Sequence, residues 1–164
     1  MFALLRLQGA LCVPDYASGM RRQYDELITG LATDSTGYAQ AVADAITKSG
    51  KDFRHFASGD FQSTAHVALV CDIAKRSPRV KHWAATRETS YVQAYLASGG
   101  TIPTNLVIRI SADVIDRPAK DIGLPTSTVV TSGATCDANK RGGECGPCRK
   151  CWSRRVQNVA YPLH

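Results

Sequence analysis

Three short apolar runs, each followed by a polar loop and then a helical segment, constrain the fold of this chain most strongly. The runs lie at residues 53–57 (FRHFA), 80–85 (VKHWAA) and 106–110 (LVIRI). Their starts are about 26 residues apart, which is the length of a strand–helix unit with short connections. Because parallel strands joined by helices cross over with one handedness, this repeat predicts an α/β fold with a parallel sheet.

The sheet is expected to hold three or four strands, with a fourth strand at residues 127–131 (STVVT). Two N-terminal helices are predicted before the repeat, at residues 19–32 and from a cap at Ser35 or Thr36 to Gly50, because apolar side chains recur there with helical spacing. A closed eight-stranded barrel needs about 250 residues, whereas the chain has 164. The sequence therefore predicts a partial (β/α) barrel or an open parallel sheet.

Polar residues follow each of the three predicted strands. The loops at the carboxyl ends of parallel strands converge, so these residues are expected to line a cleft for a small polar ligand. The candidate cofactor-binding residues are Ser58, Gly59, Asp60, Arg87, Glu88, Ser111 and Asp113. The alternative is that the serines and carboxylates cap helices and turns, a role for which these residue types are favoured.

Other chemistry-bearing residues of this region are interpreted as structural. His55 and His82 fall in predicted strands and are expected to be packed or exposed strand residues rather than ligands, whereas His66 lies near a helix start and is expected to be solvated. Cys71 lies on the apolar face of a predicted helix, and Trp83 lies in a strand. Both are expected in the core.

Four of the six cysteines lie close together near the C-terminus, and they are Cys136, Cys145, Cys148 and Cys151. Two successive CxxC steps place three thiolates on one tight loop, and the earlier cysteine can complete a set of four. Four thiolates suit structural zinc or a 4Fe-4S iron-sulfur cluster. Free thiols or disulfides are the alternative, which the lack of a recognisable secretion signal disfavours. The predicted domains are an α/β domain with an N-terminal helical segment, residues 1–134, and a cysteine-rich metal-binding tail, residues 135–164.

The positive charge of the chain is concentrated in the same tail. The formal net charge is +6, and six basic side chains lie in the tail, at Lys140, Arg141, Arg149, Lys150, Arg154 and Arg155. They can neutralise the phosphates of a nucleic acid, or they can offset the charge of the thiolates, and the sequence leaves both open. No apolar stretch is long enough to span a bilayer. A cytoplasmic location without a membrane partner is therefore expected.

Three segments of the chain resemble a bacteriophage family named after mycobacteriophage gene product eighty-eight. These segments are FRHFASGDFQS, HWAATRETSYVQAYLASGGTIPTNLVIRISA and CGPCRKCWSRRVQNVAYPLH. The resemblance extends over residues 50–164. It implies a phage origin and a location in the host cytoplasm.

This family in turn is similar to radical SAM enzymes, which bind S-adenosylmethionine at the strand ends of a partial barrel. The resemblance implies that residues 58–60 lie where those enzymes hold the amino group of the cofactor, with Arg87 and Ser111 at later strand ends. Those enzymes carry a CxxxCxxC motif near the N-terminus, whereas this chain has only Cys12 there. Two expectations follow: either the sequence lacks the start of its family, or the catalytic cluster is absent and the tail cysteines form an auxiliary or structural cluster.

The resulting expectation is a phage protein with a metal cluster and a radical SAM-like cofactor cleft, and with nucleic acid as a candidate partner. The alternative is a non-catalytic accessory protein that binds a host factor involved in defence, with a structural metal site. Whether the protein is an enzyme, and its oligomeric state, are left open by the sequence.

Overall fold

A computed structural model describes residues 14–56 and 59–163 of the protein. The chain forms two compact units, residues 1–38 and residues 39–164, which are described separately. The predicted cofactor residue Ser58 lies outside the described residues, and so does Cys12. Among the described residues, no helix is both long enough and apolar enough to cross a membrane.

Both predicted N-terminal helices are confirmed. Helix α2 spans Pro14–Thr33 and helix α3 spans Ser35–Ser49. Helix α2 starts earlier than predicted, because a proline is compatible with the first turn, where its missing N–H has no helical partner. The cap of α3 also differs from the prediction. The carboxylate of Asp34 accepts a hydrogen bond from the backbone N–H of Gly37 at 2.8 Å.

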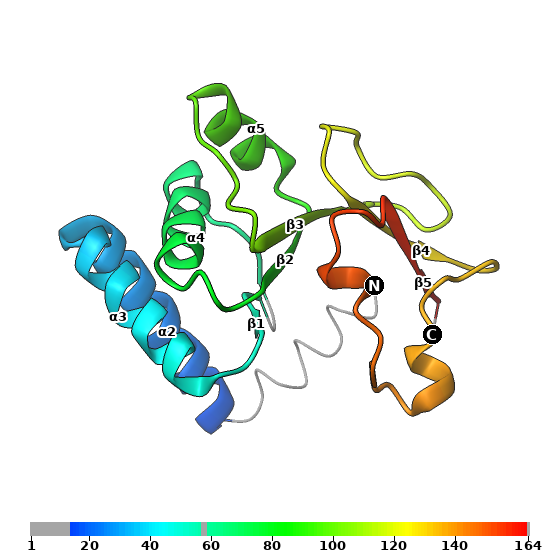
Figure 1. The fold of residues 1–164 in the computed structure, drawn as a ribbon, viewed down its shortest axis with the longest axis horizontal. Coiled ribbons are helices and arrows are strands. Elements are labelled where there is room, and N and C mark those ends of the chain that lie inside the picture. The colour runs from blue at the N-terminus through cyan, green and yellow to red at the C-terminus, as the bar shows by residue number, and fades with distance from the viewer. Residues whose placement is uncertain (1–13, 57–58, 164) are drawn as a thin grey trace. The chain divides into compact units, whose positions relative to one another are not determined.

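The second unit is built on one parallel sheet of five strands, which follow each other in chain order (Figure 1). The strands are β1 (Phe53–Arg54), β2 (His82–Thr86), β3 (Leu106–Ser111), β4 (Thr126–Val130) and β5 (Asn158–Pro162). All four strand pairs are parallel. Sequential parallel strands are the arrangement of a (β/α) barrel, and the five strands form a half-barrel. The predicted α/β class and partial barrel are confirmed.

The predicted number of three or four strands is wrong, because the segment assigned to the cysteine-rich tail contributes β5. All five residues of β5 pair with β4, from Asn158 opposite Thr126 to Pro162 opposite Val130. The sequence of β5, NVAYP, has no long apolar run, and a proline argues against a strand except at its edge or end. The strand is thus specified by its pairing with β4 more than by its own pattern.

Two helices pack on one face of the sheet (Figure 1). Helix α4 (Thr64–Arg76) connects β1 to β2, and helix α5 (Thr89–Ala97) connects β2 to β3. The predicted cap of α4 is confirmed, since Ser63 Oγ accepts from the backbone N–H of His66 at 3.1 Å. The core between the helices and the sheet contains Phe61, Val67, Val70, Cys71, Ala74, Ala84, Val92, Tyr95, Leu106, Ile108 and Ile110.

The opposite face of the sheet, here called the inner face, carries a different set of side chains. Arg54, Trp83 and Val107 share this face by strand register. The β4–β5 connection, residues 131–157, covers part of it. Its short 3-10 helix η2 (Lys150–Trp152) contacts β2 and β3, and the Trp152 ring centroid lies 5.8 Å from that of Trp83. The cysteine-rich segment therefore joins two strands and docks on the inner face.

Candidate metal centre

The first cysteine of the predicted metal site lies against the outer edge of β5. The backbone N–H groups of Thr135 and Cys136 both donate to the carbonyl of Ala160 at 2.9 Å. The N–H of Ala160 returns a hydrogen bond to Thr135 Oγ1 at 3.0 Å. The ammonium of Lys150 also donates to the Thr135 carbonyl, at 2.7 Å. Residues 135 and 136 are therefore held both by β5 and by the side chain of Lys150.

The next two cysteines lie on one tight turn. The backbone N–H of Cys148 donates to the carbonyl of Cys145 at 3.1 Å, across the Gly-Pro pair between them. Gly146 has a φ of 52°, in the left-handed region that favours glycine. A turn of this kind brings the two side chains of a CxxC pair to the same side of the loop, as metal ligands require.

The fourth cysteine is held by β5. Cys151 lies in η2, and its Sγ is 3.0 Å from the hydroxyl of Tyr161. Burial raises the pKa of the Cys151 thiol, while the Tyr161 hydrogen bond and the charge of Arg109 act in the opposite direction. Burial also raises the pKa of Tyr161 far above its usual range. Both groups are therefore neutral, and either one can donate in this hydrogen bond.

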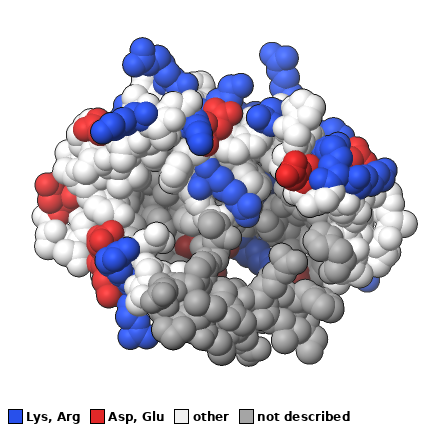
Figure 2. Space-filling view, turned by 90° about the horizontal axis from the view of Figure 1, so that it is seen from below, with Lys and Arg blue, Asp and Glu red and all other residues white. Residues whose placement is uncertain are grey.

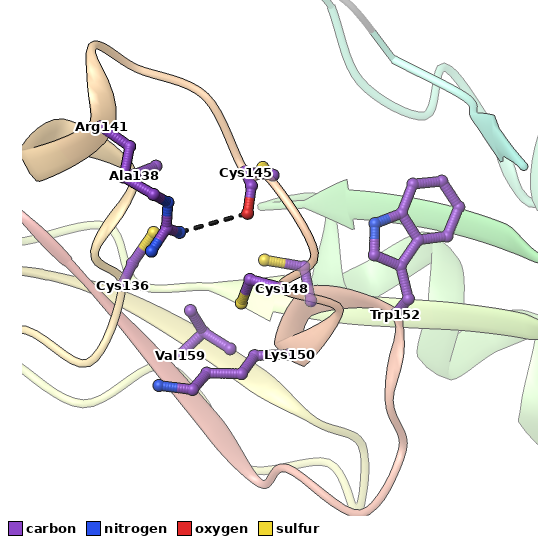
Figure 3. Close-up of a pocket in the computed structure, with 9 residues that line it drawn as sticks. Cys136, Ala138, Arg141, Cys145, Cys148, Lys150, Trp152 and Val159 are labelled. Carbon is purple, nitrogen blue, oxygen red and sulfur yellow. Dashed lines mark hydrogen bonds between the residues drawn. The ribbon is translucent and has the colours of Figure 1, made fainter.

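All four cysteines line one cavity of the β4–β5 connection, together with Ala138, Arg141, Lys150, Trp152 and Val159. Figure 3 shows Cys136, Cys145 and Cys148 around it, with the hydrogen bond from Arg141 to the Cys145 carbonyl drawn as a dashed line. The four thiols are free, and Cys145 is the most exposed of them. Within residues 14–56 and 59–163, however, no three His, Cys, Asp or Glu side chains are grouped so that they could hold a metal ion. The thiols share a cavity without forming a finished ligand set.

Most basic side chains of this segment contact protein oxygen atoms. Arg141 donates to the carbonyls of Glu144 and Cys145, and Arg149 donates to those of Gly146 and Cys148. Lys140 pairs with Asp137 at 3.0 Å. These contacts fit the interpretation that the cations shape and neutralise the cysteine loop. On the face drawn in Figure 2, Lys and Arg form separate groups with Asp and Glu among them. Nucleic-acid binding stays a prediction.

Arg154 ties the connection to the loop before β3. Its guanidinium donates to the carbonyls of Ile102, Pro103 and Leu106. Of the six basic residues of the predicted phosphate-binding tail, five thus have side-chain partners among the described residues, and the exposed Arg155 is the remaining one.

A buried arginine that sequence reasoning missed lies beneath the connection. Arg109, in the middle of β3, is 0% exposed. Its two terminal nitrogens make six hydrogen bonds to backbone carbonyls, of Thr126, Lys150, Ser153, Val156 and Gln157. Burial lowers its pKa from the usual value. The one sequence signal was an arginine inside the apolar run LVIRI, which is unusual for a buried strand.

The predicted cofactor residues at the ends of β1 and β2 are brought together. Asp60 Oδ1 accepts from the N–H of Phe61 at 2.7 Å and from the Thr86 hydroxyl, and Oδ2 accepts from the N–H of Arg87 at 2.8 Å. The Thr86 hydroxyl in turn accepts from the N–H of Glu88 at 2.9 Å. These contacts are of the turn-forming kind that was weighed as the alternative to ligand binding.

The remaining predicted cofactor residues, Gly59, Ser111 and Asp113, have no contact with one another in the hydrogen bonds of the described residues. Ser111 Oγ is 3.1 Å from Ser127 Oγ, which joins the carboxyl end of β3 to the start of β4. Ser127 was not among the predicted site residues. Gly59 has a φ of 84°, so its backbone needs glycine. The predicted residue Asp113 is exposed and has no hydrogen bond or ion pair recorded among the described residues.

Histidines on the helix-covered face form a hydrogen-bonded chain. Ser77 Oγ donates to the Ile73 carbonyl at 2.7 Å, so it accepts from His82 Nε2 at 2.8 Å. His82 Nδ1 is then an acceptor for His55 Nε2 at 3.0 Å. Two neutral imidazoles with fixed tautomers result, and of the packed and exposed strand positions predicted for them the structure shows the packed one.

The expectation of a solvated His66 is wrong. This residue is 6% exposed and lies edge-on to the rings of Phe56 and Phe61. The polar loop before α4 suggested solvent, but the phenyl rings of that loop fold back over the first turn of the helix.

No curated protein and no solved structure matches the chain significantly. A family described as Gene product 88 does match, over residues 31–154. The matched region includes α4, α5, the first four strands and all four cysteines of the candidate metal centre. Because the match covers well over half of the sequence, the protein belongs to the bacteriophage family Gene product 88.

Proposed function

We propose that the four cysteines of the β4–β5 connection bind a metal centre, either a tetrahedral zinc ion or a 4Fe-4S cluster. The observation that carries this proposal is that Cys136, Cys145, Cys148 and Cys151 line one cavity. Thiolates are soft ligands that select zinc and iron-sulfur clusters over magnesium or calcium. Four of them, with no carboxylate in the lining, form a donor set suited to both.

The surroundings of the cavity fit a thiolate centre. Four thiolates around zinc or a 4Fe-4S cluster carry net negative charge, which Arg141 and Lys150 in the cavity lining can offset. Gly142 and Gly143 have φ values of 66° and 90°, so the loop before Cys145 can turn sharply. Closing the ligand set requires reorientation of cysteine side chains that are anchored at several points along their backbone.

The metal centre would have a structural role. It would join the edge of β5, where Cys136 lies, to the segment that covers the inner face, where Cys151 lies. Binding energy of a metal at a site that the unfolded chain lacks adds to the free energy of folding. The ion would thus hold the β4–β5 connection against the half-barrel.

Metal analysis and an absorption spectrum of anaerobically purified protein test this proposal. One zinc per chain and no colour indicates the zinc form, whereas about four irons with broad absorption near about 400 nm indicates the cluster. The double variant Cys145→Ser, Cys148→Ser should lose the metal. The matched control is Cys71→Ala, in the core of α4, which should retain it. Protein that is metal-free in the wild type, or equally loaded in the double variant, would refute the proposal.

A second candidate function is the binding of a small polar cofactor, such as S-adenosylmethionine, at the carboxyl ends of the strands. The observation that favours it is the gathering of Asp60, Thr86, Arg87 and Glu88 at the ends of two neighbouring strands. The Arg87 side chain is exposed there, and the Glu88 carboxylate makes no capping bond to α5. Both charged groups are thus available for the carboxylate and amino groups of a ligand.

Calorimetric titration with S-adenosylmethionine tests the second candidate. Binding that is lost in the double variant Arg87→Ala, Glu88→Gln would support it. The matched control is Arg117→Ala, which removes an exposed arginine from the loop between β3 and β4. The absence of heat with the wild-type protein would exclude the cofactor and leave the accessory, non-catalytic role. The same titration tests the cofactor site that the similarity to radical SAM enzymes implies.

A further inference from the structure

We propose that Arg109 is the positioning residue that docks the cysteine-bearing segment onto the half-barrel and thereby places Cys151 for metal binding. This inference rests on the proposed metal centre, and it adds the residue of the sheet on which that centre depends. Arg109 lies on β3, about 40 residues before Cys151 in the chain. Its role follows from burial, from hydrogen bonding and from the shape of its guanidinium.

The burial of Arg109 needs an explanation, because a buried charge is costly unless it is compensated. None of the ion pairs among the described residues includes it. Compensation comes instead from the carbonyl dipoles of five residues. Four of these carbonyls belong to the β4–β5 connection, at Lys150, Ser153, Val156 and Gln157.

These acceptors lie directly around the fourth cysteine. Lys150 precedes Cys151, and its carbonyl accepts from Arg109 Nη2 at 3.3 Å. Ser153 follows two residues later, and its carbonyl accepts from the same nitrogen at 3.0 Å. The backbone on both sides of Cys151 is thus fixed to β3, while its sulfur faces Tyr161 on β5.

Only a guanidinium fits this arrangement. Nη1 bonds Thr126, Val156 and Gln157, and Nη2 bonds Lys150, Ser153 and Val156, so two nitrogens reach two sets of carbonyls. A lysine carries its donors on a single nitrogen and cannot span both sets. The requirement for arginine is therefore a requirement for shape as well as charge.

The experiment compares Arg109→Lys and Arg109→Met with the wild type. The matched control is Arg155→Lys, which makes the same change at an exposed side chain of the same connection. In reduced, metal-free protein, the alkylation rate of each cysteine with N-ethylmaleimide is measured by peptide mass spectrometry. Buried Cys71 reports on the core and exposed Cys145 on the accessible limit.

In both Arg109 variants, Cys151 should react at least about tenfold faster than in the wild type, while Cys71 stays protected and Arg155→Lys behaves as wild type. Competition with a zinc chelator should show metal affinity at least about tenfold weaker in the same variants. An affinity change of this size corresponds to about 1.4 kcal/mol.

Unchanged protection of Cys151 in both variants would overturn the proposal. Loss of Cys71 protection in both would also overturn it, because Arg109 would then support the whole sheet. If no variant and no wild-type protein binds metal, but Cys151 is released as expected, the proposed metal function fails while the docking role of Arg109 stands.

Discussion

The carboxylate of Asp60 joins the loop after β1 to the end of β2 through hydrogen bonds to Phe61, Thr86 and Arg87. In Asp60→Asn, one acceptor oxygen becomes an NH2 group that faces another donor. We expect the free energy of unfolding to fall by about 1–3 kcal/mol, because a donor loses its hydrogen bond to a charged, part-buried carboxylate. Urea denaturation measures this change.

The matched control for Asp60→Asn is Asp113→Asn, the same substitution at an exposed position of the β3–β4 loop. A surface change of this kind should alter the stability by less than about 0.5 kcal/mol. Equal effects of the two substitutions would contradict the bridging role of Asp60.

Buried histidines make the stability depend on pH. Burial lowers the pKa of His55 to about 3 and that of His66 to about 4, and it also lowers the pKa of His82. The unfolded chain has histidine pKa values of about 6.5. Between about pH 6.5 and pH 4, the unfolded chain therefore binds protons that the folded chain does not, and this difference lowers the free energy of unfolding as the pH falls.

We expect the histidine contribution to be fully present above about pH 7 and to be lost at up to about 1.4 kcal/mol per pH unit for each group. Urea denaturation at several pH values between 4 and 7.5 measures the slope. His66→Gln should lower this slope of the unfolding free energy against pH by the contribution of about one proton, since glutamine does not titrate. A slope that is the same in His66→Gln and in the wild type would show that His66 binds protons equally in the folded and unfolded states, against the lowered pKa.

The sequence showed which residues lie at notable positions better than it showed what their side chains contact. The four tail cysteines were identified from their spacing alone, and the structure places them around one cavity. Asp60 was selected for its place after a strand, which is right, but its oxygens bond the loops of the fold. Arg109 could not be identified, because four of its five partner carbonyls lie 41 or more residues away in the chain and only folding brings them close.

After helix α5, the backbone of Gly100 lies close to the ring and the carbonyl oxygen of Tyr95. A Cβ at Gly100 would lie 2.5 Å from the ring of Tyr95 and 2.6 Å from the Tyr95 carbonyl oxygen. The ring could turn, but the backbone oxygen is held by the helix. We expect Gly100→Ala to lower the free energy of unfolding by about 1–3 kcal/mol, as overpacking does. Denaturation followed by circular dichroism measures it.

A glycine in open space supplies the control for Gly100→Ala. A Cβ at Gly19, inside α2, would meet nothing within 4 Å. Gly19→Ala should therefore favour its helix by up to about 1 kcal/mol, through helix propensity. Destabilisation by both substitutions would mean that the added methyl group at Gly100 is not the cause.

Elements with a repeating local pattern were predictable, and the others were not. Two of the three predicted strand–helix units, β1–α4 and β2–α5, follow from apolar runs and polar loops within each unit, with the Ser63 cap in the first. The helix predicted after the third run is wrong, because β3 leads to β4 through a loop with no helix. Strand β5 has five residues and no helix after it, so its existence depends on β4. Propensity describes such an element poorly, because its stability comes from the neighbouring strand.

At the scale of the second unit, the β4–β5 connection covers part of the inner face of the half-barrel. In a closed barrel, side chains from other strands fill the interior. Here the residues of η2 lie against β2 and β3, and Trp152 lies beside Trp83. The predicted division of the chain at residue 134 separates this connection from the inner face that it covers. The two parts share one sheet, which no local sequence pattern could show.

Removal of residues 135–164 should therefore abolish cooperative folding of the remaining chain. The fragment 1–134 would lack β5, would expose Trp83 and the buried Val107, and would leave Arg109 with only the Thr126 carbonyl. We expect no cooperative urea transition, strong binding of an apolar dye and rapid proteolysis. The matched control is the fragment 39–164, cut at the boundary of the compact units, which should still unfold cooperatively. A cooperative transition in fragment 1–134 would show that the half-barrel is stable without the cysteine-rich connection, and the inner face would then need another cover.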